Sequence, residues 1–129
     1  IMLEDSAAML PSVQLIGASY DLDKHHHEKV LDAVKIAKDK PSVFLYHTPT
    51  DLTAAVKHNI DLQLAGHTHR GQIWPFRLLV RLNFKYVYGQ FREKNSFIYV
   101  APGSATWGPK MKLGSHNEIT LHIIEPIKK

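Results

Sequence analysis

The chain has 129 residues, of which 44% are hydrophobic and 22% are charged, a composition typical of a folded globular domain. It contains nine histidines and no cysteine, which excludes disulfide bridges, thiolate zinc sites and iron–sulfur clusters. Any metal must therefore be bound through imidazole and oxygen ligands. The formal net charge of +4 suits an anionic substrate or surface, and we expect no nucleic acid partner.

We expect a single unit over residues 1–129, because no repeat, low-complexity tract or linker divides the chain. No apolar run approaches the ~20 residues needed to cross a bilayer, and the start lacks a signal-peptide pattern. The first residue, Ile1, suggests that the chain is a piece of a longer protein.

In the first half of the chain, three apolar strands alternate with two helices. The expected strands are residues 13–17, 43–46 and 61–65, and the expected helices run from Asp21 or Asp23 to about Lys38 and from Thr48 to about Asn59. The second helix begins with a hydroxyl cap, a proline at its first position and Asp51 three residues past the cap. Strands joined through such helices run parallel.

The second half predicts two more strands, at residues 97–100 and 118–124. In the last one, Ile119, Leu121 and Ile123 alternate with polar residues, so one face should be in contact with water. The predicted fold class is α/β with some antiparallel character.

Residues 73–91 predict an amphipathic helix with a basic face. Arg77, Arg81 and Lys85 recur every four residues and would share one side of a helix. Such a helix with aromatic ends suits a membrane surface or a lipid substrate. The alternative is a surface helix whose apolar side covers the core.

Histidines follow two of the predicted parallel strands. One strand stops at His47, and the other is followed by Gly66, His67 and His69. Because parallel strands place their carboxyl ends at one edge, we expect these three imidazoles to form a metal site. Imidazole ligands suit zinc, iron, manganese, nickel or cobalt. No acid accompanies them, so a three-histidine zinc site and a two-metal site with ligands from elsewhere both stay open.

His25, His26 and His27 lie near a predicted helix start. Neighbouring residues on a helix point about 100° apart, so these three cannot share one ion. We expect them to be exposed helix surface.

Residues 66–75 read GHTHRGQIWP and are similar to the GHTHGGQ signature of calcineurin-like metallophosphoesterases, closest to a membrane-associated bacterial branch. Residues 45–49 resemble that branch's L-S-H-x-P motif, and residues 100–109 and 112–114 resemble its Gly-rich C-terminal segment. Residues 118–120 match its final strand. The family's N-terminal motifs, D-x-H, G-D-x-x-D and G-N-H-D/E, have no counterpart. The resemblance thus implies the C-terminal half of a four-layer α/β/β/α sandwich whose N-terminal half is absent.

The resemblance also implies roles for individual residues. His47 and His67 would ligate the second of two divalent metal ions, and His69 the first. The family's catalytic histidine would lie in the absent half, so none is expected on this chain. Arg70 stands where the family has glycine, and Lys112 stands for a usual arginine. Both are candidates for binding substrate, and the alternative for each is a solvated loop cation.

The implied activity is metal-dependent hydrolysis of phosphoester or pyrophosphate bonds, with lipids among the candidate substrates. The implied location is peripheral to the bacterial cytoplasmic membrane. We expect the chain alone to be inactive and to form oligomers or exchange strands. The rival hypothesis is a non-catalytic basic module that binds a membrane surface or a protein partner.

Overall fold

The computed structural model describes residues 2–125 and contains one six-stranded sheet of order β1-β2-β3-β4-β6-β5. The strands are β1 (Ser6–Met9), β2 (Gln14–Gly17), β3 (Ser42–Leu45), β4 (Leu62–Ala65), β5 (Gly89–Glu93) and β6 (Ser96–Val100). The four inner strands are parallel to one another, and the edge strands β1 and β5 are antiparallel to their neighbours. The predicted α/β class and its βαβ units are confirmed.

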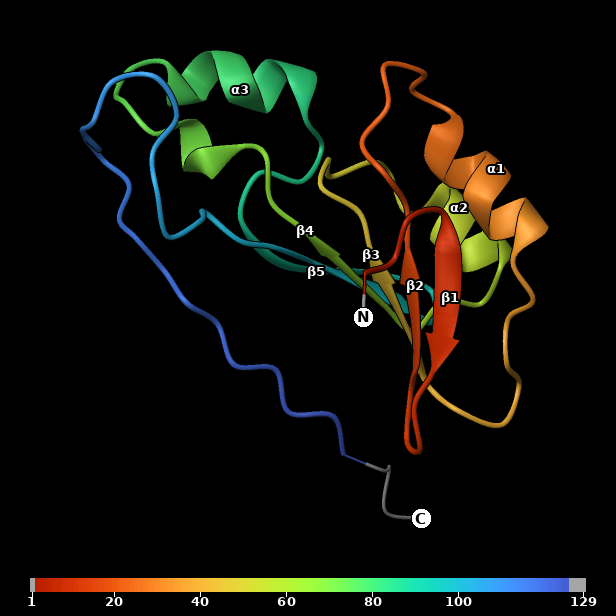
Figure 1. The fold of residues 1–129 in the computed structure, drawn as a ribbon. Coiled ribbons are helices and arrows are strands. Elements are labelled where there is room, and N and C mark those ends of the chain that lie inside the picture. The colour runs from red at the N-terminus through yellow and green to blue at the C-terminus, as the bar shows by residue number, and fades with distance from the viewer. Residues whose placement is uncertain (1, 126–129) are drawn as a thin grey trace.

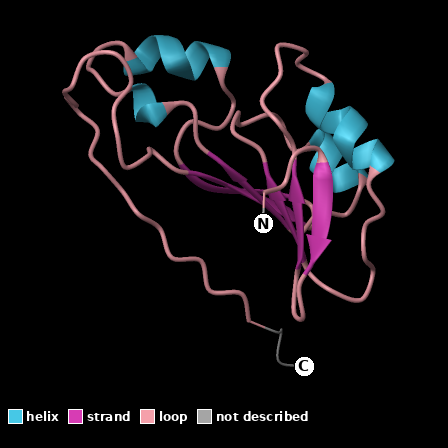
Figure 2. Cartoon of the chain, viewed as in Figure 1, coloured by secondary structure: helices cyan, strands magenta, loops and turns pink. Residues whose placement is uncertain are grey.

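Two short helices cover one face of the sheet, and two others lie beyond the strand ends (Figure 1 and Figure 2). The first pair is α1 (His26–Ala33) and α2 (Thr53–Lys57), and the second is the 3-10 helix η1 (His69–Gly71) and α3 (Arg77–Asn83). Among residues 2–125, no helix has the length and apolar character needed to cross a membrane.

The core lies between the sheet and the α1–α2 pair. Ile16, Phe44 and Ile98 come from three strands, lie on the same face and are 0% exposed. Leu31 of α1 and Leu52 at the start of α2 belong to the same buried cluster. These helices therefore supply the covering layer that the apolar strands require on this side.

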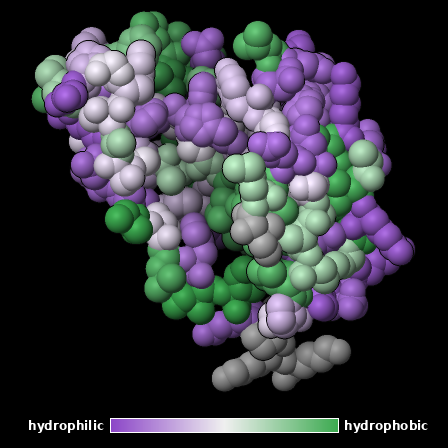
Figure 3. All heavy atoms as spheres, viewed as in Figure 1, coloured by the Kyte–Doolittle hydropathy of each residue, from purple (hydrophilic) through white to green (hydrophobic). Residues whose placement is uncertain are grey.

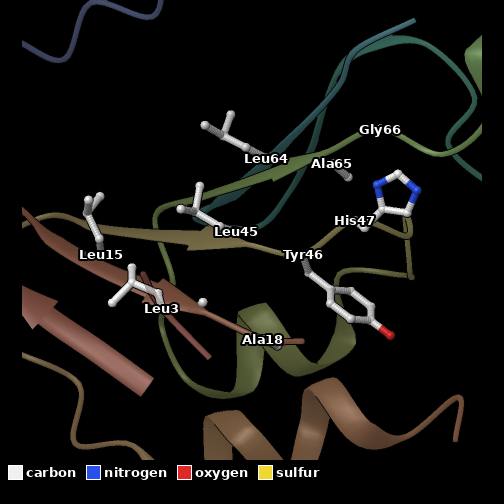
Figure 4. Close-up of a pocket in the computed structure, with 10 residues that line it drawn as sticks. Leu3, Leu15, Ala18, Leu45, Tyr46, His47, Leu64, Ala65 and Gly66 are labelled. Carbon is white, nitrogen blue, oxygen red and sulfur yellow. The ribbon is translucent and has the colours of Figure 1, made fainter. Parts of the chain in front are cut away.

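The opposite face of the sheet, called the open face below, is apolar, and apart from the buried Val43 its leucines are only half-buried. Leu45 and Leu64 pair across β3 and β4, and Leu15 lies on the same face of β2. Figure 4 shows these three side chains pointing away from the helices. Together with Leu3 they line a broad, shallow hollow. A sheet that is apolar on both faces suits part of a layered sandwich, as predicted.

The first helix ends earlier than predicted, since α1 stops well before Lys38. The cause is the buried side chain of Gln14 on β2. Its amide nitrogen donates to the carbonyl oxygen of Lys35 at 2.8 Å, and its amide oxygen accepts from the backbone nitrogen of Ala37 at 2.8 Å. These bonds hold the residues after α1 in a non-helical course.

The second helix begins later than predicted from Thr48. The carboxylate of Asp51 accepts a hydrogen bond from the backbone nitrogen of Thr53 at 3.0 Å, so the acid binds the first turn. The carbonyl oxygen of Thr48 instead accepts from the backbone nitrogen of Thr50 at 2.9 Å. The helix exists, but its predicted start was wrong.

The predicted strand over residues 118–124 is wrong, because this segment pairs with no strand of the described chain. Its exposed apolar side chains include Ile119 (92%), Leu121 (84%) and Ile123 (74%). The hydroxyls of Tyr88 and Tyr99 both donate to the Glu118 carboxylate, which turns the polar side of the segment toward the sheet. Figure 3 shows hydrophobic atoms at the surface along this segment, which is blue in Figure 1.

The predicted helix over residues 73–91 is only partly formed, as α3. Phe84, directly after α3, has an extended backbone. Tyr86 is 4% exposed, and its ring lies 4.9 Å from that of Phe91 between centroids. The end of the range forms the start of β5, and neither β5 nor β1 was predicted from the sequence. No residue of α3 is buried, so the alternative in which this helix covers the core is wrong.

The three consecutive histidines differ in their surroundings. His25 is exposed and lies 3.2 Å from the Glu28 carboxylate, and His26 is half-buried. His27 is 5% exposed, and its ring stacks on that of Tyr46 at 5.3 Å between centroids. The prediction of exposed helix surface was therefore wrong for His27, because α1 turns this residue toward the sheet.

Candidate metal centre

His47 and His67 face each other just beyond the carboxyl ends of β3 and β4. The backbone nitrogen of Gly66 donates to the carbonyl oxygen of His47 at 3.0 Å, which extends the pairing past the strands. The two imidazole rings lie 5.1 Å apart between centroids and are perpendicular. Figure 4 shows the His47 ring beside Gly66 at this edge. The parallel strands thus bring these two side chains together.

His69 lines the same cavity, which encloses about 860 Å³ and is called the histidine cavity below. Its remaining wall is mostly apolar and comes largely from α3, Phe84 and Trp107. The Nδ1 atom of His69 is buried and has no hydrogen-bond partner in the described chain. The Nδ1 atom of His27 is likewise buried and unpartnered within the described residues, so this property alone does not mark a ligand.

The donors in the histidine cavity suit a metal ion, but the set is incomplete. Two imidazoles on one tetrahedral zinc ion, with Zn–N distances of about 2.0–2.1 Å, place their ring centres roughly 5 Å apart. The pair formed by His47 and His67 matches that spacing. Within residues 2–125, however, no three His, Asp or Glu side chains lie close enough to hold one ion. The described chain thus brings two imidazoles together, and a third lines the same cavity.

The surroundings of His67 and His69 lower the pKa of both imidazoles, which favours their neutral form. Burial lowers the pKa of His67, and the neighbouring His47 and His69 lower it further. Burial also lowers the pKa of His69, as does the ammonium group of Lys112. The neutral ring is the form that binds a metal.

The loop after β4 has an unusual backbone at the residues that carry this chemistry. The φ angles of His67, His69, Arg70 and Gln72 are 64°, 46°, 54° and 39°, in the left-handed region that favours glycine. Each such residue costs of order 1–3 kcal/mol and persists only where its surroundings hold it. Clusters of this kind are typical of functional sites.

Two side chains that were not among the predicted site residues hold this loop. The hydroxyl of Thr68 donates to the carbonyl oxygen of Val87 at 2.6 Å. The amide of Gln72, which is 2% exposed, donates to the carbonyl oxygen of Trp107 at 2.8 Å and accepts from its backbone nitrogen at 2.9 Å. Both residues lie inside the GHTHRGQ segment, and that position was the only signal for them in the sequence.

Lys112 contacts the backbone of the Gly-rich segment. Its ammonium group donates to the carbonyl oxygens of Pro102 at 3.3 Å, Gly103 at 3.0 Å and His116 at 3.2 Å. An ammonium group has three donors, so each finds an acceptor within the protein. A role for Lys112 in binding substrate stays a prediction, and the contacts described show a residue that holds a loop beside His69.

Arg70 points away from the histidine cavity. Its guanidinium carbon lies 4.3 Å from the centre of the Tyr88 ring, a cation–π contact. The side chain lines a separate basic pocket together with residues of α3. Its predicted role toward substrate is likewise untested.

Several curated proteins are similar to this chain. An uncharacterized metallophosphoesterase of Helicobacter pylori is 40% identical over 82 residues, which cover 62% of this chain and 22% of that protein. One from Campylobacter jejuni is 37% identical over 110 residues, which cover 82% of this chain and 29% of that protein. A Bos taurus transmembrane protein with a metallophosphoesterase domain is 37% identical over 101 residues, covering 76% of this chain and 22% of that protein. No protein-family model matches the chain, and no solved structure does.

The chain spans less than a third of the length of each of these relatives, between 22% and 29%. Its α/β sheet with βαβ units is consistent with part of a metallophosphoesterase fold. The chain is therefore a distant relative of the metallophosphoesterases and is homologous to part of these longer proteins.

Proposed function

We propose that the chain is the C-terminal part of a metal-dependent phosphohydrolase, in which His47, His67 and His69 are metal ligands. The observation that carries this proposal is the facing pair of imidazoles at two parallel strand ends, with the third imidazole in the same cavity. The substrates would be phosphoesters or pyrophosphates, and a lipid is one candidate. The names of the relatives support the reaction class and leave the substrate open.

Divalent metal ions in such enzymes polarise phosphoryl oxygens and lower the pKa of bound water. This chain would supply the three histidine ligands and hold their imidazole rings in position. Thr68 and Gln72 fix the strained loop that carries His67 and His69. No carboxylate lines the histidine cavity, so a bridging acid and the remaining ligands would come from outside the described chain. We therefore expect weak metal binding and no catalysis from these residues alone.

Metal titration of the chain tests the ligand roles. Isothermal calorimetry with Mn²⁺ and Zn²⁺ would compare the chain with His67→Ala, and with His25→Ala as the matched control on the exposed surface of the protein. Loss of outer-shell partners alone weakens metal sites about 10–100-fold, so loss of a ligand should cost at least about tenfold. The control should bind as the unaltered chain does. Equal affinities for all three proteins would contradict the ligand role.

The reaction class is tested in the longer protein that contains these residues. With Mn²⁺ it should hydrolyse a chromogenic phosphodiester, and His67→Ala should abolish this activity, whereas the 129-residue chain should show none. Full activity of the longer protein carrying His67→Ala would refute the proposal. Activity of the short chain would support a self-sufficient three-histidine hydrolase instead.

A second candidate function, a non-catalytic module at a membrane surface, is favoured by the surface of α3. This helix has no buried residue, and its Leu78, Leu79 and Leu82 are 48%, 54% and 82% exposed beside Arg77 and Arg81. The upper edge of Figure 3 shows hydrophobic atoms where α3 lies. A location peripheral to the bacterial cytoplasmic membrane is proposed on the same ground.

Flotation with phosphatidylcholine vesicles, with and without phosphatidylglycerol, separates the two functions. The membrane module predicts binding to the anionic vesicles that Leu82→Ser weakens and His67→Ala leaves unchanged. Absence of flotation by the unaltered chain would rule it out. In that case the phosphohydrolase would be the one remaining proposed function, and the hydrolysis assay would test it.

A further inference from the structure

A second cavity, called the basic pocket, lies beside the histidine cavity and encloses about 400 Å³. Its cationic lining residues are Arg70, Arg77, Arg81 and Lys85. The rest of its wall is apolar or aromatic, including Phe84 and Tyr88, and no Asp or Glu lines it. Its volume lies within the range of small-molecule sites, about 300–1,000 Å³.

The arginines of the basic pocket have no carboxylate partners. Lys85 pairs with Glu93, but no salt bridge within the described residues includes Arg70, Arg77 or Arg81. Like charges brought together repel each other, and a bound anion would relieve that repulsion. The planar guanidinium group donates two parallel hydrogen bonds to phosphate or carboxylate oxygens, and a phosphate, with its higher negative charge, suits a set of several cations better.

The backbone fixes the relative position of η1, which carries Arg70, and of the start of α3, which carries Arg77. A Cβ atom at Gly71 would lie 2.2 Å from the Cα of Arg77, so η1 and the start of α3 can touch only because residue 71 is glycine. This contact brings the backbones of residues 71 and 77 together, and the guanidinium carbon of Arg77 lies 5.7 Å from the centre of the Trp74 ring. The ring of Tyr88 lies under the Arg70 guanidinium and limits its freedom. Preorganisation of this kind reduces the cost of binding.

Phe84 lies between the basic pocket and the histidine cavity and lines both. Its ring centre is 5.5 Å from that of His67. We propose that the basic pocket binds a phosphate group of an organic ligand, whose apolar part lies against Phe84 and Tyr88. This binding requires no metal ion and does not depend on the proposed phosphohydrolase function.

The phosphate could be carried by a soluble ester or by a phospholipid headgroup, and two binding measurements separate these sources. Both use the 129-residue chain in EDTA, so that the histidines hold no metal. The soluble probe is phenyl phosphate, measured by calorimetry. The lipid probe is phosphatidylcholine vesicles with and without phosphatidic acid, measured by sedimentation.

The variants are Arg70→Gln and Arg77→Gln, with Arg92→Gln as the control that loses the same charge. Arg92 is exposed on β5, outside the basic pocket, and its Nε donates to the carbonyl oxygen of Lys94. Loss of one charge-assisted hydrogen-bonding group should weaken binding about tenfold, and the control should stay within about twofold. Arg81→Gln, at an exposed position, serves as a further variant should either of the first two fail to fold.

Saturable binding of phenyl phosphate that both pocket variants lose would support the proposal with a soluble ligand. Binding only to vesicles that contain phosphatidic acid, with the same loss, would support it with a lipid headgroup. No binding of either probe, or an equal loss in Arg92→Gln, would overturn it. Because metal is absent, these outcomes are independent of whether the histidines support hydrolysis.

Discussion

The two faces of the sheet carry similar apolar side chains in different surroundings. On the helix face, Ile16, Phe44 and Ile98 are 0% exposed beneath α1 and α2. On the open face, Leu45 and Leu64 are only half-buried, and no helix or strand of the described chain packs over them. A strand that is apolar throughout therefore predicts two covering layers, and residues 2–125 supply helices for only one of them.

The largest expected difference between the faces comes from truncating Phe44. Phe44→Ala removes a fully buried ring from the centre of the helix face, and we expect a loss of about 3–5 kcal/mol in the free energy of unfolding. Urea unfolding followed by circular dichroism measures it. A loss below about 1 kcal/mol would mean that this face is packed no better than the open face.

The helix-covered half of the fold could be predicted from local patterns because its strands and crossovers are short and regular. The apolar runs ending near Gly17, Tyr46 and Ala65 indicated strands, and the crossover rule placed His47 and His67 at one edge. These inferences need only residue type and order. Both histidines are where that reasoning put them.

Element ends and the C-terminal segment depend on contacts between distant residues, which the local pattern does not contain. α1 stops early because Gln14 binds the backbone at Lys35 and Ala37, more than twenty positions away. The alternating segment at residues 118–124 contacts the sheet through the Glu118 carboxylate, which accepts hydrogen bonds from Tyr88 and Tyr99, and its alternation contains no sign of these partners.

Only part of the basic pocket could likewise be predicted from the sequence. The spacing of Arg77, Arg81 and Lys85 predicted one side of a helix, but only Arg77 and Arg81 lie on α3, and Lys85 lies beyond its end while lining the same pocket. That Arg70 joins them depends on the contact between Gly71 and Arg77. A contact between two backbone segments produces no periodic pattern of residues from which it could be predicted.

A smaller effect is expected from His27 on the helix face, where the free energy of unfolding should depend on pH. His27 of α1 is buried against Tyr46, and burial lowers the pKa of its imidazole below the ordinary 6.5, despite the opposing charges of Glu28 and Asp51. The unfolded chain therefore binds a proton more readily than the folded one. The contribution of His27 to stability is full above about pH 6.5 and declines as the pH falls toward the lowered pKa.

His27→Phe keeps a ring on Tyr46 and removes this titration. Urea unfolding at about pH 7.5 and about pH 5 should show a smaller acid-induced loss of stability than in the unaltered chain. His25→Gln, at an exposed position of the same turn, should retain the full loss. An unchanged pH dependence in His27→Phe would assign the acid sensitivity to other groups.

The smallest effect is expected on the open face. Leu64→Ser removes a half-buried side chain that borders the shallow hollow, so we expect a loss of about 1 kcal/mol or less in the free energy of unfolding. The same variant should bind less of the dye ANS, because it removes exposed apolar surface. Ala8→Ser on β1 is a control outside that hollow. If Leu64→Ser lowers the free energy of unfolding as much as Phe44→Ala does, the open face is covered in solution. Self-association of the chain, which stays a prediction, would be the first explanation to test, by measuring its oligomeric state.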